Sequence, residues 1–215
     1  MPVNKFFTEI EIKELIFKNS TLPFGYRNAA LILGAVYWGL TPSELSLLRL
    51  KDVMHEEGVF YKAWIVPESI AYNGFARELQ TSDKILPFFE KYMKWRSSFN
   101  IFPSSSHLFR HSQGQSPFFI NDIYRAYKLS PSKTGNPDSQ AKSMSNKLMQ
   151  LIGNANINGA TPSTFRDTFV REMYKKGCQY NELKLVSGIR KKETIDRKIS
   201  PNEIELCNIY QSIFT

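Results

Sequence analysis

The sequence predicts a mainly α-helical protein with one small antiparallel sheet. Capping signals that start helices recur along the chain, and residues 27–39 carry apolar side chains on every side of a helix. Between two such signals, residues 58–66 are rich in β-branched and aromatic residues, which is typical of a strand. With 215 residues the chain is long enough for one large core, so we expect a single domain over residues 1–215.

Three helices are expected first. Residues 8–11 form a capping box before a helix that runs to about Lys18. Residues 27–39 are expected to be the central helix, because a helix that is apolar all round must be buried. Residues 41–44 repeat the capping box, with proline at the first helical position, and open a helix over residues 45–50.

The sheet is expected over about residues 52–80, with three antiparallel strands. Residues 58–66 and 76–80 supply the clearest strand patterns. Between them, Asn73 and Gly74 suit the two positive-φ positions of a tight hairpin turn.

Loops and shorter helices alternate in the second half. The predicted helices cover residues 83–96, 120–127, 161–176, 181–188 and 201–215. We expect Ser82 and Asn181 to be N-caps of two of them. Loops rich in Ser, Pro, Asn and Gly fill residues 97–118 and 129–143, and residues 129–138 are the best candidate for a mobile segment.

Positive charge gathers in the second half of the chain. The net charge is +8, and residues 103–198 hold sixteen Lys and Arg against seven Asp and Glu. A basic surface of this kind suits a polyanionic partner, most often nucleic acid, although a solvated basic face is the alternative.

Several protein classes have no support in the sequence. The apolar run over residues 29–40 is shorter than the ~20 residues that a membrane helix needs, and the N-terminus lacks the pattern of a secretion signal. We therefore expect a cytoplasmic protein without a membrane partner. Two cysteines are too few for a disulfide framework, so Cys178 and Cys207 are expected to be buried free thiols. His107 and His111 lie four residues apart but have no neighbouring carboxylate or thiol, so we expect no metal and no cofactor.

Five strings, in the right order, resemble the catalytic domain of the tyrosine recombinases, or phage integrases. They are residues 6–12, 27–53, 73–77, 161–169 and 183–188. The second string resembles a buried helix followed by the family's Gly-Leu-Arg-x-Ser-Glu-Leu, and the fourth is similar to Thr-Pro-His-x-Leu-Arg-His-Thr-Phe. The resemblance covers nearly the whole chain. It implies an integrase-like fold and a role in DNA recombination or integration, with a mobile element as the setting.

The resemblance also implies where catalytic residues would stand. In the family, two arginines clamp the scissile phosphate, a lysine and a histidine transfer protons, a second histidine or a tryptophan assists, and a tyrosine is the nucleophile. The positions of the first arginine, the lysine, the two histidines and the tyrosine are held here by Thr41, Tyr72, Ser163, Ile189 and Lys198. Arg166 is the one position that keeps the family residue. We therefore expect a degenerate, non-catalytic member of the family, a pseudoenzyme.

The leading hypothesis is a DNA-binding protein that is accessory or regulatory to recombination. The side chains expected to contact double-stranded DNA are Arg166, Arg190, Lys191, Lys192, Arg197 and Lys198. One alternative is an active site-specific recombinase with Tyr210 as a displaced nucleophile, for which Tyr72, Tyr174 and Tyr180 are further candidates. Another is a protein-interaction module that pairs with a true recombinase and does not bind DNA.

The last predicted helix has an apolar face that must be covered. Its members are Ile204, Leu206, Ile209, Tyr210 and Ile213. Because a large exposed apolar patch is unusual for a monomer, the face is expected to be buried in cis or on a neighbour. The family exchanges this helix between protomers, which implies a homo-oligomer or an active recombinase as partner through residues 201–215.

Overall fold

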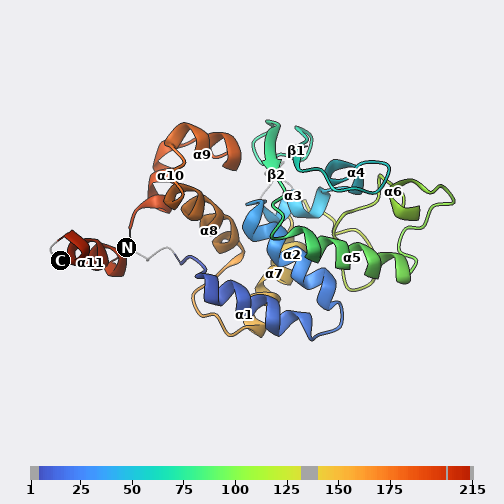
Figure 1. Ribbon diagram of the computed structural model, residues 1–215, viewed down its shortest axis with the longest axis horizontal. Helices are drawn as coiled ribbons and strands as arrows, with labels where there is room; N and C mark the ends of the chain where they lie inside the picture. Colours follow the sequence, from blue (N-terminus) through green and yellow to red (C-terminus); the bar gives the residue numbers. More distant parts are fainter. Residues whose placement is uncertain (1–4, 132–139, 202, 214–215) are drawn as a thin grey trace.

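The fold is mainly helical with one small antiparallel sheet, as the sequence predicts (Figure 1). The computed structural model describes residues 5–131, 140–201 and 203–213, so most of the segment predicted to be mobile lies outside the described residues. The helices are α1 (Glu9–Ser20), α2 (Gly25–Tyr37), α3 (Pro42–Leu47), α4 (Leu50–Val53), α5 (Leu86–Ser98), α6 (Leu108–His111), α7 (Lys142–Asn154), α8 (Pro162–Lys175), α9 (Tyr180–Ser187), α10 (Lys192–Ile199) and α11 (Glu203–Ile213).

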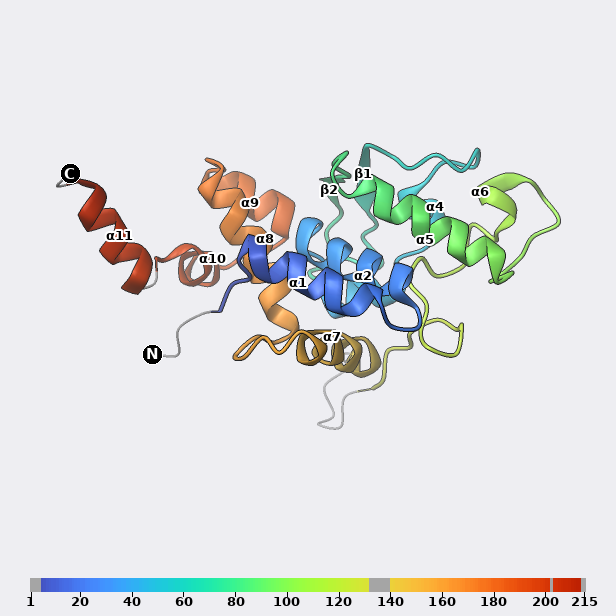
Figure 2. The ribbon, with the colours of Figure 1, turned by 60° about the horizontal axis from the view of Figure 1, so that its bottom comes forward.

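Helix α2 is the centre of the main core. Every residue from Arg27 to Val36 is buried, which confirms the helix predicted to be apolar all round. Helices α1, α5 and α8 pack around it (Figures 1 and 2). Just beyond its end, the fully buried Trp38 ring lies 4.9 Å from the Trp64 ring and 4.6 Å from the Phe89 ring, between centroids. Helix α2 therefore joins the sheet and α5 to the rest of the fold.

The sheet has two strands within the described residues, so the prediction of three strands is wrong. Strand β1 (Ala63–Val66) pairs antiparallel with β2 (Arg77–Gln80). The expected third strand is reduced to an isolated bridge between Met54 and Phe60. The Asp52 side chain accepts a hydrogen bond of 2.8 Å from the Arg49 backbone N–H and caps α4, and this short helix occupies the chain where a third strand would begin.

The predicted two-residue hairpin turn is also wrong. Residues 67–76 form a longer connection, which begins with a turn closed by the Ala71 N–H on the Pro67 carbonyl, at 3.0 Å. Gly74 has a φ of +64°, as the turn prediction requires, but Asn73 does not share this conformation.

No helix forms over residues 120–127. Ile120 and Ala126 pair as an isolated antiparallel bridge instead. The Asn121 side-chain oxygen accepts hydrogen bonds of 3.0 Å from the backbone N–H groups of Ile123 and Arg125. Asparagine favours such turns over helix, so a local side-chain interaction overrides the helical pattern here.

Several helix boundaries differ from the prediction. Helix α3 ends earlier than expected and α5 begins later, while α4, α6, α7 and α10 were not predicted. The N-cap of α9 is Gln179 rather than Asn181, with the Glu182 carboxylate accepting from the Gln179 backbone N–H at 2.6 Å. The Thr8 and Thr41 capping boxes are present as predicted.

A second, smaller cluster of buried side chains joins α8, α9 and α10. It consists of Phe169, Val170, Leu183, Ile189 and Ile195. One contact that brings it against the main core is that between Phe169 and Gly39, two residues beyond the end of α2. Gly39 has a φ of +59°, and a Cβ atom there would lie 2.3 Å from Phe169 Cδ1. The two clusters fit together because position 39 has no side chain.

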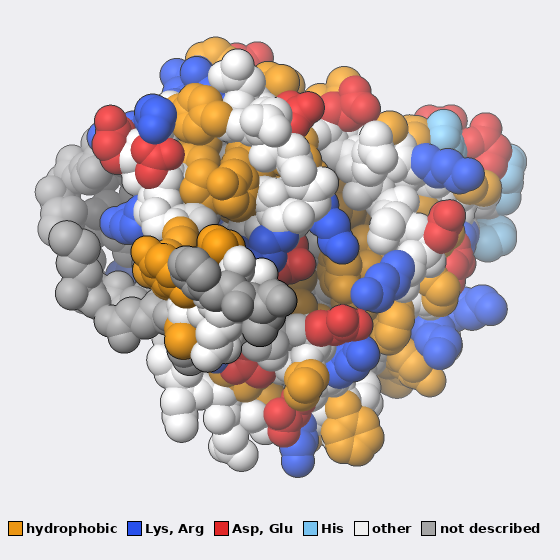
Figure 3. Space-filling model, turned by 60° about the vertical axis from the view of Figure 1, so that its left-hand side comes forward, with side chains coloured by type: hydrophobic (Ala, Val, Ile, Leu, Met, Phe, Trp, Pro, Cys, Tyr) orange, Lys and Arg blue, Asp and Glu red, His pale blue; other side chains and the backbone are white. Residues whose placement is uncertain are grey.

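Helix α11 projects from one end of the molecule (Figures 1 and 2). Leu206, Tyr210 and Ile213 are 41%, 63% and 65% exposed, so this part of the predicted apolar face is not covered in cis. Viewed from this end, apolar side chains lie on the surface beside Lys and Arg side chains (Figure 3). The prediction that both cysteines are buried is wrong, because Cys178 is half-buried and Cys207, on α11, is exposed. No helix in the described part of the chain is long and apolar enough to span a membrane.

Replacing Gly39 by alanine should destabilise the fold more than the same change at Gly74. Both residues have positive φ, which costs an alanine about 1–2 kcal/mol. A Cβ at position 39 also overlaps the Phe169 ring, which adds about 1–3 kcal/mol, whereas nothing lies within 4 Å of a Cβ at position 74. Urea unfolding of Gly39→Ala and Gly74→Ala measures the difference, and equal losses would contradict the role of the Phe169 contact.

Candidate functional site

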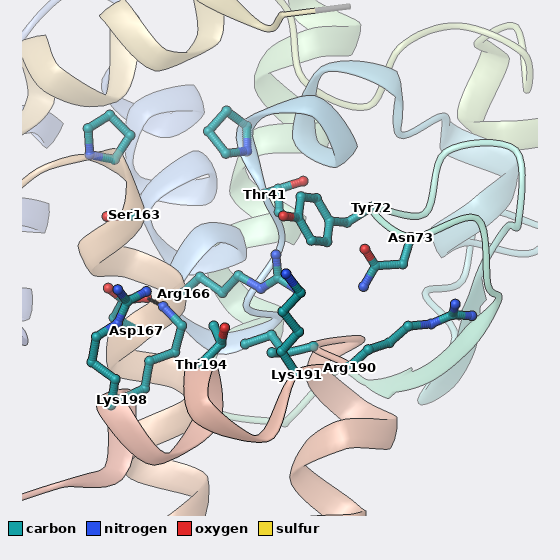
Figure 4. Close-up of a pocket in the computed structure, with 14 residues that line it drawn as sticks. Thr41, Tyr72, Asn73, Ser163, Arg166, Asp167, Arg190, Lys191, Thr194 and Lys198 are labelled. Atoms are coloured by element: carbon teal, nitrogen blue, oxygen red, sulfur yellow. Dashed lines mark hydrogen bonds and ion pairs between the residues drawn. The ribbon is translucent and has the colours of Figure 1, made fainter. Parts of the chain in front are cut away.

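A hollow of about 490 Å³ opens where four segments of the chain meet. These segments are the start of α3, the connection between β1 and β2, the first turns of α8, and the chain from the end of α9 into α10 (Figure 4). We call this hollow the first pocket. Its walls come from residues more than 150 positions apart in the sequence, between Thr41 and Lys198.

The first pocket brings together all six positions at which the sequence resemblance places catalytic residues. Its lining includes Thr41, Tyr72, Ser163, Arg166, Ile189 and Lys198. The sequence did not single out Asn73 or Thr194 as site residues, although both line the same pocket. Asn73 comes from the connection between β1 and β2 and Thr194 from α10, so their proximity depends on tertiary packing, which no local pattern reveals.

Glu44 anchors the wall formed by α3. Its carboxylate is fully buried and accepts hydrogen bonds of 2.8 Å from the Thr41 backbone N–H and 2.9 Å from the Tyr72 backbone N–H. It also forms an ion pair with Arg77, on β2. Three segments of the chain therefore converge on one carboxylate. The sequence predicts Glu44 as part of a capping box, but no pattern in it indicates the pairing with Arg77.

The Glu44 carboxylate is held in its charged form. Burial alone would raise the pKa of Glu44, but the hydrogen bond and positive charge of Arg77, together with the charge of Arg166, bring it below its ordinary value. The buried cations and this anion therefore stabilise one another.

Arg166 is a buried arginine at the base of the first pocket. It is 8% exposed and donates from Nη2 to the Ser187 carbonyl oxygen, which ties α8 to the end of α9. The Tyr72 ring covers it, with 4.7 Å between the guanidinium carbon and the ring centroid (Figure 4). Burial lowers the pKa of Arg166, and the charge of Arg77 adds to this effect while that of Glu44 opposes it. The Tyr72 ring therefore limits how much of Arg166 a ligand in the first pocket can contact.

The position of the family's tyrosine holds a paired lysine. Lys198 donates to the Asp167 carboxylate, and both side chains are largely buried (Figure 4). Ser163, at the first histidine's position, shares a hydrogen bond of 2.9 Å with the Thr161 hydroxyl. Neither position offers a nucleophile activated by a neighbouring base.

The lining of the first pocket is strongly basic. Its described residues include five cations, Arg166, Arg190, Lys191, Arg197 and Lys198, and one carboxylate, Asp167. Arg190, Lys191 and Arg197 are exposed, so three of the cations are accessible to a ligand. Lys192 lies outside the lining, at the first position of α10, where it pairs with Asp196 at 2.8 Å.

The remaining candidate residues lie elsewhere. Tyr210 is on the projecting α11 and does not line the first pocket, and Tyr174 and Tyr180 do not line it either. Within the described residues, no group of three or more His, Cys, Asp and Glu side chains is close enough to hold a metal ion.

Comparison with known proteins identifies the fold. No protein-family model and no curated protein sequence matches this chain. Solved structures do match: XerA recombinase is 17% identical, with a TM-score of 0.69 over 97% of this chain and 64% of XerA. The Tn1549 transposon integrase, solved in complex with circular intermediate DNA, is 13% identical, with a TM-score of 0.63 over 98% of this chain and 66% of the integrase. The catalytic domain of bacteriophage HP1 integrase is 17% identical, with a TM-score of 0.52 over 95% of this chain and 94% of that domain.

This chain thus spans about two thirds of the first two proteins and nearly all of the third. It has the fold of the tyrosine recombinase catalytic domain, as the sequence resemblance implied.

The Glu44→Gln variant should lose stability in a pH-dependent way. At neutral pH the change breaks a buried ion pair, which costs about 3–5 kcal/mol. The folded-state pKa of Glu44 lies below its ordinary value of 4.5, so the carboxylate stabilises the fold above this pH and less as the pH falls through the folded-state pKa. Urea unfolding at several pH values should show the difference from the native sequence shrinking in acid.

Glu9→Gln is the control, because Glu9 forms an exposed pair with Lys13. It should change stability little at any pH. If Glu44→Gln lowered the free energy of unfolding by the same small amount, the buried ion pair would not contribute to the stability of the fold.

Proposed function

We propose that this chain is a non-catalytic DNA-binding protein that uses a tyrosine-recombinase fold as its scaffold. Its role is accessory or regulatory to the recombination or integration of a mobile element, in the cytoplasm. The observation that carries the proposal is the chemistry of the first pocket, which keeps a strongly basic lining but has a lysine paired with Asp167 where the family has its nucleophile.

The proposed DNA contacts are the exposed cations at the mouth of the first pocket. Arg190, Lys191 and Arg197 are accessible, while Arg166 and Lys198 add positive charge from the wall. Structural neighbours with the same fold were solved with DNA, namely the Tn1549 integrase and XerH recombinase bound to its difH substrate. These complexes support DNA as the ligand proposed for this chain.

The proposal that catalysis is absent follows from electrostatics. Phosphoryl transfer depends on preorganised cations that stabilise the transition state, and losing one such donor typically costs about 3–4 kcal/mol. Thr41, Tyr72, Ser163 and Ile189 supply no cation at four of the positions that the family uses. Lys198 supplies no hydroxyl at the fifth, so both the charge stabilisation and the nucleophile are missing.

Two other candidate functions, an active recombinase and a protein-interaction module, are each favoured by one observation on α11. Tyr210 is 63% exposed on the projecting helix, as a nucleophile donated to a neighbouring molecule would have to be. The exposed apolar side chains of α11 equally suit a protein-interaction module without DNA affinity. The experiments below separate these functions from the leading proposal.

Replacing Arg190 and Lys191 together by alanine should weaken DNA binding and reduce its salt dependence. Without a recognisable base-reading element we expect a Kd of about 10⁻⁴ to 10⁻⁶ M at physiological salt. Each cation that contacts a phosphate contributes about one unit to the slope of log K against log salt, so the double variant should lose about two units. Fluorescence anisotropy with a labelled duplex at several salt concentrations measures this slope.

Lys192→Ala is the matched control for that measurement. Lys192 follows directly in the chain but lies outside the first pocket and pairs with Asp196, so it should change the slope by less than the pocket residues do. If the unmodified protein does not bind duplex DNA even at about 50 mM salt, the basic surface is a solvated face and the proposed function fails.

The protein should form no covalent adduct with DNA. A nicked suicide substrate traps any phosphotyrosine intermediate as a species that denaturing electrophoresis resolves. We expect none, because the positions around Arg166 lack the required groups. An adduct that disappears in Tyr210→Phe would instead establish the active recombinase with a displaced nucleophile.

We also propose that a second copy of this chain covers the exposed face of α11. Deleting residues 206–215, which keeps Glu205 and its ion pair with Arg171, should then convert an oligomer to a monomer in analytical ultracentrifugation, without lowering the melting temperature of the rest. Leu206 and Ile213 are exposed, so the double change to serine should have the same effect. If the unmodified protein stayed monomeric at high concentration, a second copy would not cover the face of α11. A different protein, such as an active recombinase, would then be the partner to test.

A further inference from the structure

A second basic hollow adjoins the first pocket. It has a volume of about 460 Å³ and lies between the connection that precedes β2 and helix α9. Asn73 and Arg190 line both hollows, so they form the wall between them. The Asn73 side chain donates to the Gly188 carbonyl oxygen, which fixes this wall. We call this hollow the second pocket.

The lining of the second pocket is positively charged. Its described lining contains three cations, Arg77, Lys184 and Arg190, and no carboxylate. Positive charges confined in one hollow repel each other and favour the binding of a negative ligand.

Arg77 supplies a buried donor without an acceptor. It is 6% exposed, donates from Nε to the Val186 carbonyl at 3.2 Å and forms an ion pair with Glu44 through Nη1. Its Nη2 group is buried and has no hydrogen-bond acceptor among the described residues. A group buried to this degree is out of reach of a ligand in the hollow, so Arg77 contributes positive charge from the wall, shared with Glu44, while Lys184 and Arg190 are the exposed cations.

Arg190 is held in a defined orientation beside it. Its guanidinium carbon lies 3.4 Å from the centroid of the Phe75 ring, a stacked geometry that leaves the edge of the guanidinium able to donate hydrogen bonds. Planar guanidinium groups bind phosphate through two such donors at once. Lys184 adds a third, exposed cation from α9.

We propose that the second pocket binds a phosphate of the nucleic acid backbone, next to the phosphate that faces the first pocket. This inference rests on the proposed DNA-binding function and adds a second contact point to it. Phe75 and Leu185 line the rim and are 56% and 70% exposed. Apolar side chains beside three cations suit a phosphate that carries a sugar rather than a free ion.

Two variants test the pocket without disturbing the core. Lys184→Ala removes an exposed cation, and Asn181→Asp places a carboxylate in the pocket at the second position of α9, where an acidic side chain is compatible with the helix. In anisotropy titrations with duplex DNA, Lys184→Ala should reduce the salt slope by about one unit. Asn181→Asp should weaken binding several-fold. Lys94→Ala, an exposed lysine on α5 that lines neither pocket, should have no effect.

A second measurement distinguishes a backbone phosphate from a free ion. Inorganic phosphate, titrated into the isotope-labelled protein, should shift the amide signals of Asn181 and Gly188 weakly, and Asn181→Asp should abolish the shift. Leu185→Ala should weaken DNA binding while leaving the response to inorganic phosphate unchanged. A Leu185→Ala variant that binds DNA as the native protein does would contradict the contact with a sugar.

The results separate this inference from the function on which it rests. If the native protein binds DNA and neither Lys184→Ala nor Asn181→Asp changes the binding, the second pocket is not a phosphate site, while the proposed function stands. If the native protein does not bind DNA, the proposed function and the backbone phosphate both fail.

Discussion

The arrangement of the candidate site depends on one buried carboxylate. Glu44 accepts hydrogen bonds from the Thr41 and Tyr72 backbone groups and pairs with Arg77. Removing a carboxylate from water is expensive, and the cost is offset here because the anion is both paired and hydrogen-bonded. Arg77 in turn donates a hydrogen bond to the Val186 carbonyl oxygen of α9. The wall between the two pockets therefore has a fixed position relative to α3.

The positions that a tyrosine recombinase would use for catalysis have structural partners in this chain. Thr41 caps α3, Tyr72 stacks on Arg166, and Lys198 pairs with Asp167. Ile189 packs in the smaller apolar cluster, where a charged imidazole would be out of place. Each substitution thus satisfies a local requirement for capping, stacking, pairing or packing. Together these contacts hold the walls of the first pocket in place.

Features set by neighbouring residues could be predicted from the sequence, and features set by distant contacts could not. The capping boxes at Thr8 and Thr41 and the buried helix α2 follow from local patterns, and the structure contains them. The prediction of a third strand is wrong because Asp52 caps a short helix at that place. The prediction of a helix near Asn121 is wrong because the Asn121 side-chain oxygen accepts hydrogen bonds from the backbone N–H groups that follow it.

The candidate site shows the same division. The family resemblance named six positions, and the fold brings all of them to one hollow. Their new partners escaped prediction, since the contact of Arg77 with Glu44 joins residues 33 positions apart and that of Lys198 with Asp167 joins residues 31 apart. A sequence pattern shows which residue types are present at a site, but these pairings depend on tertiary packing.

The attachment of α11 has a mechanical consequence. Arg171, buried on α8, donates to the Ser200 carbonyl at 2.7 Å and pairs with Glu205, while Lys175 pairs with Glu205 at 3.1 Å. Among the described side chains, these polar contacts attach the first turn of α11 to α8, while Leu206, Tyr210 and Ile213 are exposed. A molecule that bound these exposed side chains would therefore act on the rest of the fold through Arg171 and Lys175, the two residues of α8 that pair with the first turn of α11.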